Sequence, residues 1–294
     1  MRIFIFVFTL GIVWGMSAQA EVQGEQLEQK IAYTLISSEE LAPVHSVLRG
    51  SLKTLLPEAE EVYLDYHCAR AKELIAELEI EHIPYVIFDD SVALEEPFFH
   101  MVKNNMIDRQ KGFYVIPEKM LRMGEVRLLG RKRIPRRLDI FVMSRCSGCD
   151  EAKEKLIKAV REQKLDIALK IRYQAKVDEF GVSSRFGAEE IREKLRQIVL
   201  QKYYPDKFWD YLILAQEKAK EEALSELGIP PEKIDARKDE ALAMLKEDAR
   251  EAELLDIKYV PAFLWENIYL ISTLEGLKNH KPFNSRILEK QNIP

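Results

Sequence analysis

The stretch Leu138-Asp139-Ile140-Phe141-Val142-Met143-Ser144-Arg145-Cys146-Ser147-Gly148-Cys149-Asp150 decides the fold of this chain. Its first six residues are mostly apolar, with β-branched and aromatic side chains that predict a buried strand. After the two cysteines the pattern changes to a helical one, which predicts a helix over 150–162. The sequence therefore places a Cys-X-X-Cys pair where a strand passes into a helix.

This position favours thiol chemistry at Cys146. Unpaired backbone N–H groups and the macrodipole at a helix N-terminus stabilise a thiolate, and Arg145 adds a positive charge with the same effect. Asp150 and Glu151 in the first helical turn act in the opposite direction. Cys149 follows about one turn later, close enough for a disulfide. We expect Cys146 to be the nucleophile or the attacked sulfur and Cys149 the resolving thiol, with the direction of electron flow left open.

The cysteine pair has two other interpretations. A zinc site needs further ligands, but there is no second Cys-X-X-Cys and the five histidines show no paired ligand spacing. We therefore expect neither a metal nor another cofactor. A static structural disulfide remains the alternative, although such a small ring contributes little entropic stabilisation. Cys68 is interpreted as a small buried residue rather than a reactive thiol.

Composition limits the class of protein. The chain has 294 residues, of which 47% are hydrophobic and 32% charged, and its formal net charge is −5. This is typical of a globular protein of mixed α/β structure with room for two domains, and the charge content argues against an integral membrane protein. The mild negative charge gives no reason to expect nucleic acid as a partner.

The first twenty residues predict export. Arg2 precedes the apolar run Ile3–Met16, and the small residues of Ser17-Ala18-Gln19-Ala20 follow it. The run is shorter than the roughly 18 apolar residues that span a bilayer, so we interpret residues 1–20 as a signal peptide cleaved after Ala20. An uncleaved membrane anchor is the alternative. We expect a periplasmic or otherwise exported protein, in an oxidising compartment, with no stable membrane insertion after cleavage.

The remaining sequence shows the same pattern twice. The first half has predicted strands at 31–36, 61–66 and 112–116, helices at 43–55 and 69–78, and an Ile83-Pro84 step before an apolar strand ending at Phe88. The second half has strands at 138–143, 165–171 and 268–271, helices at 150–162 and 273–280, and a Val260-Pro261 step before a strand ending at Trp265. A mostly helical segment over about 187–255 interrupts the second half. Short β-α-β connections predict a sheet with helices on its faces in each half.

Phe141-Val142-Met143-Ser144-Arg145-Cys146 resembles the opening of DsbA-type domains of the thioredoxin-like superfamily. The segment 201–212, QKYYPDKFWDYL, is similar to part of their helical insertion, and the resemblance covers roughly 138–282. It implies an α/β fold of two tandem thioredoxin-like domains, the second with the insertion. It also implies that Val260-Pro261 is a cis-proline step facing the cysteines, where the Val260 backbone binds substrate.

The predicted domains are 21–126, a thioredoxin-like domain without Cys-X-X-Cys, and 138–294, the DsbA-like domain. The basic stretch 127–137 is interpreted as a solvated linker, with a positive patch for an anionic partner as the alternative. Where the first domain's cysteines would stand it has Ser37-Ser38-Glu39-Glu40-Leu41-Ala42. Redox chemistry is therefore excluded there, while substrate or partner docking and a scaffold role both remain open.

The sequence thus predicts an exported thiol–disulfide oxidoreductase that acts on protein thiols and disulfides and exchanges electrons with a further redox partner. The alternative is a non-catalytic chaperone or assembly module on a thioredoxin scaffold, with a structural Cys-X-X-Cys. A metal-handling thiol protein is a third interpretation. The reduction potential of the Cys146–Cys149 pair would separate oxidase, reductase and isomerase.

Overall fold

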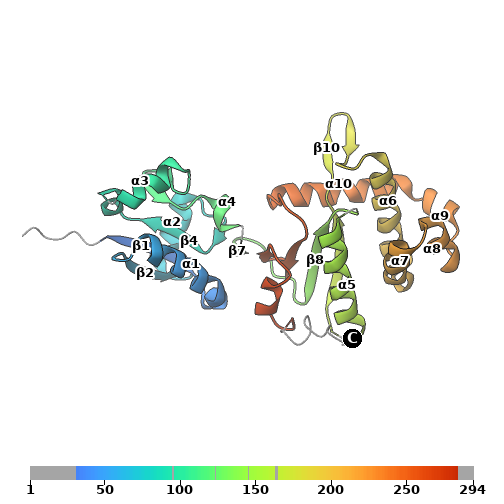
Figure 1. The fold of residues 1–294 in the computed structure, drawn as a ribbon, viewed down its shortest axis with the longest axis horizontal. Helices are drawn as coiled ribbons and strands as arrows, with labels where there is room; N and C mark the ends of the chain where they lie inside the picture. Colours follow the sequence, from blue (N-terminus) through green and yellow to red (C-terminus); the bar gives the residue numbers. More distant parts are fainter. Residues whose placement is uncertain (1–30, 95, 123, 145, 163–164, 284–294) are drawn as a thin grey trace, which may run out of the picture.

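The computed structural model describes residues 31–94, 96–122, 124–144, 146–162 and 165–283. The predicted signal peptide and Arg145 lie outside these residues. Figure 1 shows the chain as two lobes, the first drawn in blue and green and the second in yellow-green to red. Each lobe contains a β-sheet flanked by helices, which confirms the predicted α/β fold class.

The first lobe is built around a five-stranded sheet of order β2-β1-β4-β6-β5. Strand β1 pairs parallel with β2 and antiparallel with β4, and β6 continues the sheet antiparallel to β4. Its elements are β1 (Ala32–Ser37), η1 (Glu39–Leu41), α1 (Ala42–Leu55), β2 (Glu60–Asp65), α2 (Ala69–Leu78), β3 (His82–Ile83), β4 (Tyr85–Phe88), η2 (Asp90–Leu94), α3 (Glu96–Lys103), β5 (Asp108–Gln110), β6 (Phe113–Val115) and α4 (Glu118–Leu121).

Local sequence signals account for the two long helices of this lobe. Helix α1 has Pro43 in its first turn, where the missing N–H costs no hydrogen bond. Helix α2 is capped by Cys68, whose Sγ accepts a hydrogen bond from the backbone N–H of Ala71 at 3.4 Å. Cys68 is half-buried and carries no disulfide. It therefore ends a turn and starts a helix, in keeping with a structural role.

The second lobe is built around a six-stranded sheet of order β3-β7-β13-β12-β8-β9. Strand β8 pairs parallel with β9 and antiparallel with β12, and β13 follows antiparallel to β12. Its elements are β7 (Glu125–Leu128), β8 (Arg137–Val142), α5 (Ser147–Glu162), β9 (Ala168–Tyr173), β10 (Lys176–Asp178), β11 (Gly181–Ser183), α6 (Ala188–Tyr203), α7 (Pro205–Glu217), α8 (Lys220–Glu226), α9 (Pro231–Asp235), α10 (Lys238–Leu254), β12 (Ala262–Trp265), β13 (Tyr269–Ile271) and η3 (Gly276–Asn279).

Two hydrophobic clusters lie on opposite faces of this second sheet. Ile140 and Val142 of β8 join the larger cluster, which includes Leu156 of α5. Phe141, between them in sequence, joins the smaller cluster with Leu255, just after α10. Alternate residues of a strand point to opposite faces, so α5 and the end of α10 cover the two sides of β8. Packing on both faces holds β8 in place, and the segment with the cysteine pair follows the end of this strand.

The two lobes share one order of connections. In each, two parallel strands joined by a helix are followed by an antiparallel pair of strands, after the single helix α2 in the first lobe and after α6–α10 in the second. In each, the antiparallel pair begins directly after a cis X–Pro peptide bond, Ile83–Pro84 or Val260–Pro261. That the two lobes are tandem thioredoxin-like domains, and the boundaries between them, stay predictions.

Some elements differ from the sequence-based expectation. Strand β7 spans both sides of the expected boundary at residue 126, because Arg127 pairs with Tyr269 of β13 and Leu128 pairs with His82 of β3. Much of the basic stretch after it is not a free linker, since Arg131, Arg133 and Arg136 form ion pairs with Glu251, Glu266 and Asp166. The expected terminal helix over 273–280 is the short 3-10 helix η3. The helical insertion, from α6 to α10, agrees with the expected 187–255.

Candidate active site

Cys146 and Cys149 are joined by a disulfide at the start of α5, with their Cα atoms 5.1 Å apart. Strand β8 ends at Val142, and the short segment from Met143 to Cys146 leads into the helix. Cys149 is 0% exposed, whereas Cys146 is half-buried. Of the two cysteines, Cys146 is therefore the one that is partly exposed to an incoming thiolate.

The backbone of α5 holds the Cys146 sulfur directly. The N–H of Cys149 donates a hydrogen bond to Cys146 Sγ at 3.2 Å, and the N–H of Asp150 donates to the Cys146 carbonyl at 2.9 Å. Cys146 thus occupies the position of a helix N-cap, whose side chain satisfies an otherwise unpaired N–H. The same donor and the positive end of the helix dipole favour the thiolate when the disulfide opens.

The two carboxylates near the start of α5 each have a lysine partner. Asp150 is 2.6 Å from Lys153, which is 4% exposed, and Glu151 is 2.6 Å from Lys155. The hydrogen bond from Lys155 lowers the pKa of Glu151. These lysines offset the negative charge that, from the sequence, opposes a thiolate at Cys146. The i,i+3 and i,i+4 spacings that bring them together were visible in the sequence.

Pro261 lies against the cysteine motif. A Cβ built on Gly148 would stand 3.8 Å from Pro261 Cδ, so the ring is in contact range of the residue between the cysteines. The Val260–Pro261 bond is cis, as the resemblance implies, and both residues are half-buried. The structure thus brings the cysteine pair and Pro261 together. Binding of substrate by the Val260 backbone stays a prediction.

Glu190 is a further residue of this region that sequence reasoning missed. Its carboxylate on α6 accepts hydrogen bonds from the Ser144 N–H at 3.2 Å and the Phe186 N–H at 3.4 Å, and also from the Ser184 hydroxyl. It lies 3.1 Å from Lys194 Nζ, and both side chains are 0% exposed. Burial acts to raise the pKa of Glu190, but the hydrogen bond from Ser184 and the charge of Lys194 outweigh it and lower that pKa. The insertion thereby holds the segment that leads to Cys146.

Within the described ranges, no group of three or more histidine, cysteine or acidic side chains is arranged to hold a metal ion. None of the helices in the same ranges is both long and apolar enough to cross a bilayer. The residues that the structure gathers at the end of β8 are those of a disulfide site.

No known family model matches the sequence, and no curated protein matches it significantly. Solved structures do. A DsbA disulfide interchange protein from Klebsiella pneumoniae shares 16% identity at a TM-score of 0.39, over 56% of this chain and 89% of that one. A putative protein disulfide isomerase from Nitrosomonas europaea shares 14% at 0.40, over 49% and 94%.

The oxidoreductase NmDsbA1 from N. meningitidis shares 16% identity at a TM-score of 0.36, over 58% of this chain and 94% of that one. About half of this chain is thus similar to solved DsbA-type proteins, and the chemistry assigned to it rests on the chain's own residues.

Proposed function

We propose that this protein is an exported thiol–disulfide oxidoreductase that exchanges disulfides with protein substrates through Cys146 and Cys149. The observation that carries the proposal is the bridge at the start of α5, in which Cys146 is reachable and Cys149 is fully buried. A purely structural bridge has no need of one accessible sulfur held by a helix N-terminus. Export is inferred from the residue pattern of 1–20.

The exchange proceeds in two substitutions at sulfur. A substrate thiolate attacks Cys146 Sγ, so that a new substrate–Cys146 disulfide forms, the Cys146–Cys149 bond breaks and Cys149 leaves as a thiolate. A second substrate thiolate then attacks the substrate sulfur of the mixed disulfide and displaces Cys146 as a thiolate. The substrate loses two electrons and two protons overall, and the protein pair gains them. Run backwards, the same steps reduce a substrate disulfide.

The neighbouring groups support each step. The Cys149 N–H and the dipole of α5 stabilise the Cys146 thiolate as a leaving group. Pro261, beside Gly148, has no N–H of its own, which leaves the Val260 backbone as the group proposed to pair with an extended substrate. We propose 138–294 as the catalytic domain, 21–126 as a thioredoxin-like domain without redox chemistry, and 127–137 as their connection.

Two cysteine variants test the proposal. We expect Cys146→Ser to abolish both insulin reduction and oxidation of a dithiol peptide, because no sulfur remains for the attack. Cys149→Ser should instead accumulate mixed disulfides between Cys146 and substrate, visible on a non-reducing gel, because the resolving thiol is missing. Cys68→Ser is the matched control and should keep full activity, since Cys68 caps α2 in the other lobe.

Wild-type activity in both Cys146→Ser and Cys149→Ser would rule out the proposal. A disulfide that glutathione cannot reduce, together with a Cys146 thiol of ordinary pKa, would favour a binding module with a structural bridge instead. For an active protein, the reduction potential of the pair then assigns the direction of electron flow.

A further inference from the structure

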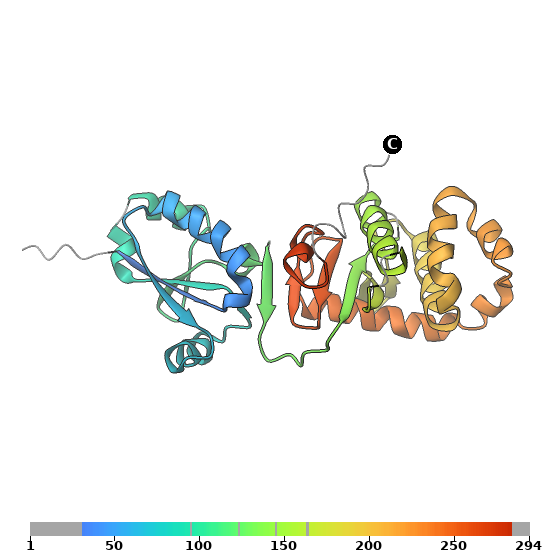
Figure 2. The same cartoon turned by 90° about the horizontal axis from the view of Figure 1, so that it is seen from below.

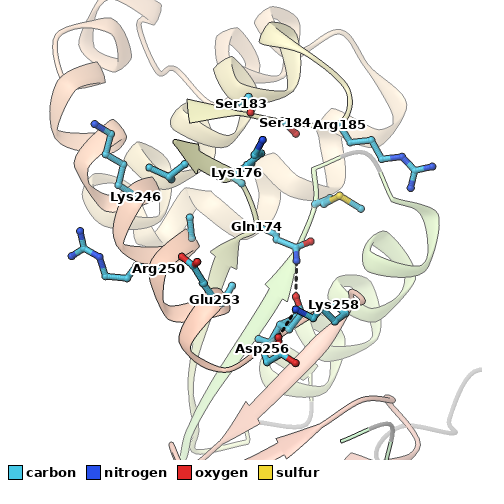
Figure 3. A pocket seen from close by; sticks show the side chains of 16 residues that line it. Gln174, Lys176, Ser183, Ser184, Arg185, Lys246, Arg250, Glu253, Asp256 and Lys258 are labelled. Carbon is cyan, nitrogen blue, oxygen red and sulfur yellow. Dashed lines mark hydrogen bonds and ion pairs between the residues drawn. The ribbon is translucent and has the colours of Figure 1, made fainter. Parts of the chain in front are cut away.

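A pocket of about 860 Å³ opens beside the disulfide site. Its walls come from the β10–β11 hairpin, the C-terminal half of α10 and the segment that leads to Pro261 (Figure 3). Met143, at the end of β8, and Lys258, three residues before Pro261, both line it. These two lining residues lie three positions before Cys146 and Pro261 in the sequence.

Positive charge gathers at this pocket, although the whole chain is acidic at −5. Two carboxylates line the pocket, those of Glu253 and Asp256. Asp256 pairs with Lys258, and Asp178 of the hairpin pairs with Lys176. The lining cations outnumber the lining carboxylates and are Lys176, Arg185, Lys246, Arg250 and Lys258. Among the residues that the structure describes, no carboxylate lies within ion-pair distance of Arg185, Lys246 or Arg250. We call this lining the basic pocket.

The cations surround the basic pocket rather than converge at one point. In Figure 3, Lys246 and Arg250 extend from α10 on one side, Arg185 extends on the opposite side, and Lys176 lies between them. One small anion cannot contact such widely separated groups together. A long ligand with several negative charges can contact them in turn.

Exposed apolar side chains adjoin the same surface. Phe180, at the tip of the β10–β11 hairpin, is 92% exposed, and Tyr259, next to Lys258, is 83% exposed. Val177 lines the pocket and Phe186 follows Arg185, and both are also exposed. Large apolar groups left in water beside a pocket mark a surface that contacts another protein. Their presence favours a polypeptide as the ligand.

We propose that the basic pocket docks an extended, acidic segment of the polypeptide whose cysteines are exchanged at Cys146. The inference rests on the proposed function and names its substrate class. Acidic side chains of the segment pair with Lys246, Arg250 and Arg185, and apolar ones contact Phe180 and Tyr259. Met143 and Lys258 line the pocket three positions before Cys146 and Pro261, and the bound segment is proposed to run from there toward the disulfide. Charge attraction also raises the rate of encounter.

The test compares dithiol peptides of equal length whose flanking residues are acidic, neutral or basic. We expect wild-type protein to show about tenfold higher kcat/KM for the acidic than for the neutral peptide at low salt. This ratio should fall as salt is added, because the pairing charges are exposed. In Lys246→Glu/Arg250→Glu the ratio should fall to about one or below, since two attractive charges become repulsive.

The matched control is Lys233→Glu/Lys238→Glu. It reverses the same number of exposed positive charges in the same helical insertion, but neither residue lines the basic pocket. It should keep the wild-type ratio. Equal kcat/KM for acidic and neutral peptides in an active wild-type protein overturns the docking inference and leaves the proposed exchange activity standing.

Binding separates the docking inference from the exchange activity. A fluorescent acidic peptide with serine in place of both cysteines should bind wild-type protein and not Lys246→Glu/Arg250→Glu, whether or not exchange occurs. Absence of binding to wild-type protein overturns the inference. A dimer in sedimentation that Lys246→Glu/Arg250→Glu dissolves also overturns it, because the surface is then an interface between copies of this chain.

Discussion

Glu190 and Lys194 form a buried pair whose two charges depend on each other. Both side chains are 0% exposed, and Lys194 also donates hydrogen bonds to the Gln174 carbonyl at 2.7 Å and the Ser184 hydroxyl at 2.9 Å. Removing one partner of such a pair leaves the other charge buried and uncompensated, which costs roughly 3–5 kcal/mol. The pair is thus a strong constraint on the segment before Cys146.

We therefore expect Glu190→Gln to lower the free energy of unfolding by about 3 kcal/mol, and Lys194→Met to have a similar effect. The double variant should lose clearly less than the two single losses together, because no charge is left unpaired. Chemical denaturation measures all three. Glu189→Gln, at an exposed position of the same helix turn, should change stability by less than about 0.5 kcal/mol. Additive single losses would contradict the pairing.

His82 is a second buried polar side chain with a measurable consequence. It is 0% exposed, and neither ring nitrogen has a hydrogen-bond partner among the described residues. Burial, together with the positive charge of Arg122, lowers its pKa from 6.5 to about 3. Below pH 6.5 the unfolded chain takes up a proton at His82 that the folded chain does not, so folding stability falls as the pH drops toward 3.

For each pH unit below 6.5, the His82 contribution amounts to at most about 1.4 kcal/mol of lost stability. Urea denaturation at pH 8 and pH 5.5 measures it in wild type and in His82→Leu, which cannot take up the proton. We expect the difference between the two pH values to be smaller in His82→Leu. His100→Leu, at an exposed position, should keep the wild-type difference, and an unchanged difference in His82→Leu would disprove the role.

Sequence shows chemistry at single residues better than it shows burial. Cys146 and Cys149 belong to one local motif, whereas the position of Pro261 beside them was expected only from the resemblance to DsbA-type domains. Glu190 was not expected there, because Ala188-Glu189-Glu190-Ile191-Arg192-Glu193-Lys194 has the charge pattern of a solvated helix face. Glu189 and Glu190 are the same residue type, and only the packing of α6 against Ser144 and Ser184 distinguishes them.

A buried ion pair and a hydrogen bond join helix α10 to the second sheet. Asp248, 4% exposed, lies 2.8 Å from Arg172 Nη1 and accepts a hydrogen bond from the Tyr173 N–H at 3.1 Å. Arg172 also pairs with Asp139 of β8 at 2.6 Å. One arginine of β9 thus ties α10 to the strand that leads to the cysteines.

We expect Asp248→Ala to destabilise the protein by about 3 kcal/mol, because Arg172 loses a buried partner and the Tyr173 N–H loses its acceptor. The loss should be local at first, so amide hydrogen exchange should accelerate in α10 more than in α5. Exchange followed by mass spectrometry gives both rates. The control is Glu247→Ala, at the neighbouring exposed position, which should leave both exchange rates unchanged. If Asp248→Ala accelerated exchange in α5 and α10 equally, the effect of Asp248 would not be local to α10.

Helices and strands whose apolar residues recur with a clear period were predicted from the sequence, and elements without such a period were not. Helix α2 spans the expected 69–78, because its apolar residues recur on one face. The β10–β11 hairpin was missed, since its strands are short and largely exposed and bury no alternating face. Helix α5 begins at Ser147 instead of 150, because Cys146 acts as its cap.

The two lobes meet through backbone pairing as well as side chains. Strand β3, which comes from the first lobe, pairs with β7, and β7 pairs with β13 of the second. Figure 2 shows β7 as the green arrow between the two lobes. The loop of the first lobe at the position of the cysteine motif also takes part. Its Glu40 accepts hydrogen bonds from Arg127 of β7, at 3.0 Å, and from the Tyr269 hydroxyl of β13. That loop therefore contacts the second sheet, an outcome its sequence left open.

The Glu40–Arg127 contact is measurable by a double-mutant cycle with Glu40→Ala and Arg127→Ala. Glu40 is 59% exposed and Arg127 20%, so we expect a coupling of only about 1 kcal/mol in the free energy of unfolding. Additive losses would show that the contact contributes nothing. Glu39→Ala, paired with Arg127→Ala in a second cycle, should show no coupling, because Glu39 is exposed and no ion pair joins it to Arg127.

The same variants decide what the first lobe does for the site. If it serves as a scaffold, Glu40→Ala should leave the rate of disulfide exchange with glutathione unchanged, because Glu40 touches neither Cys146 nor Pro261. Exchange with an unfolded protein substrate should then be unchanged too. A lower rate with the protein substrate alone would mean that the first lobe binds substrate, and that its orientation, held partly by Glu40 and Arg127, matters for presenting a cysteine to Cys146.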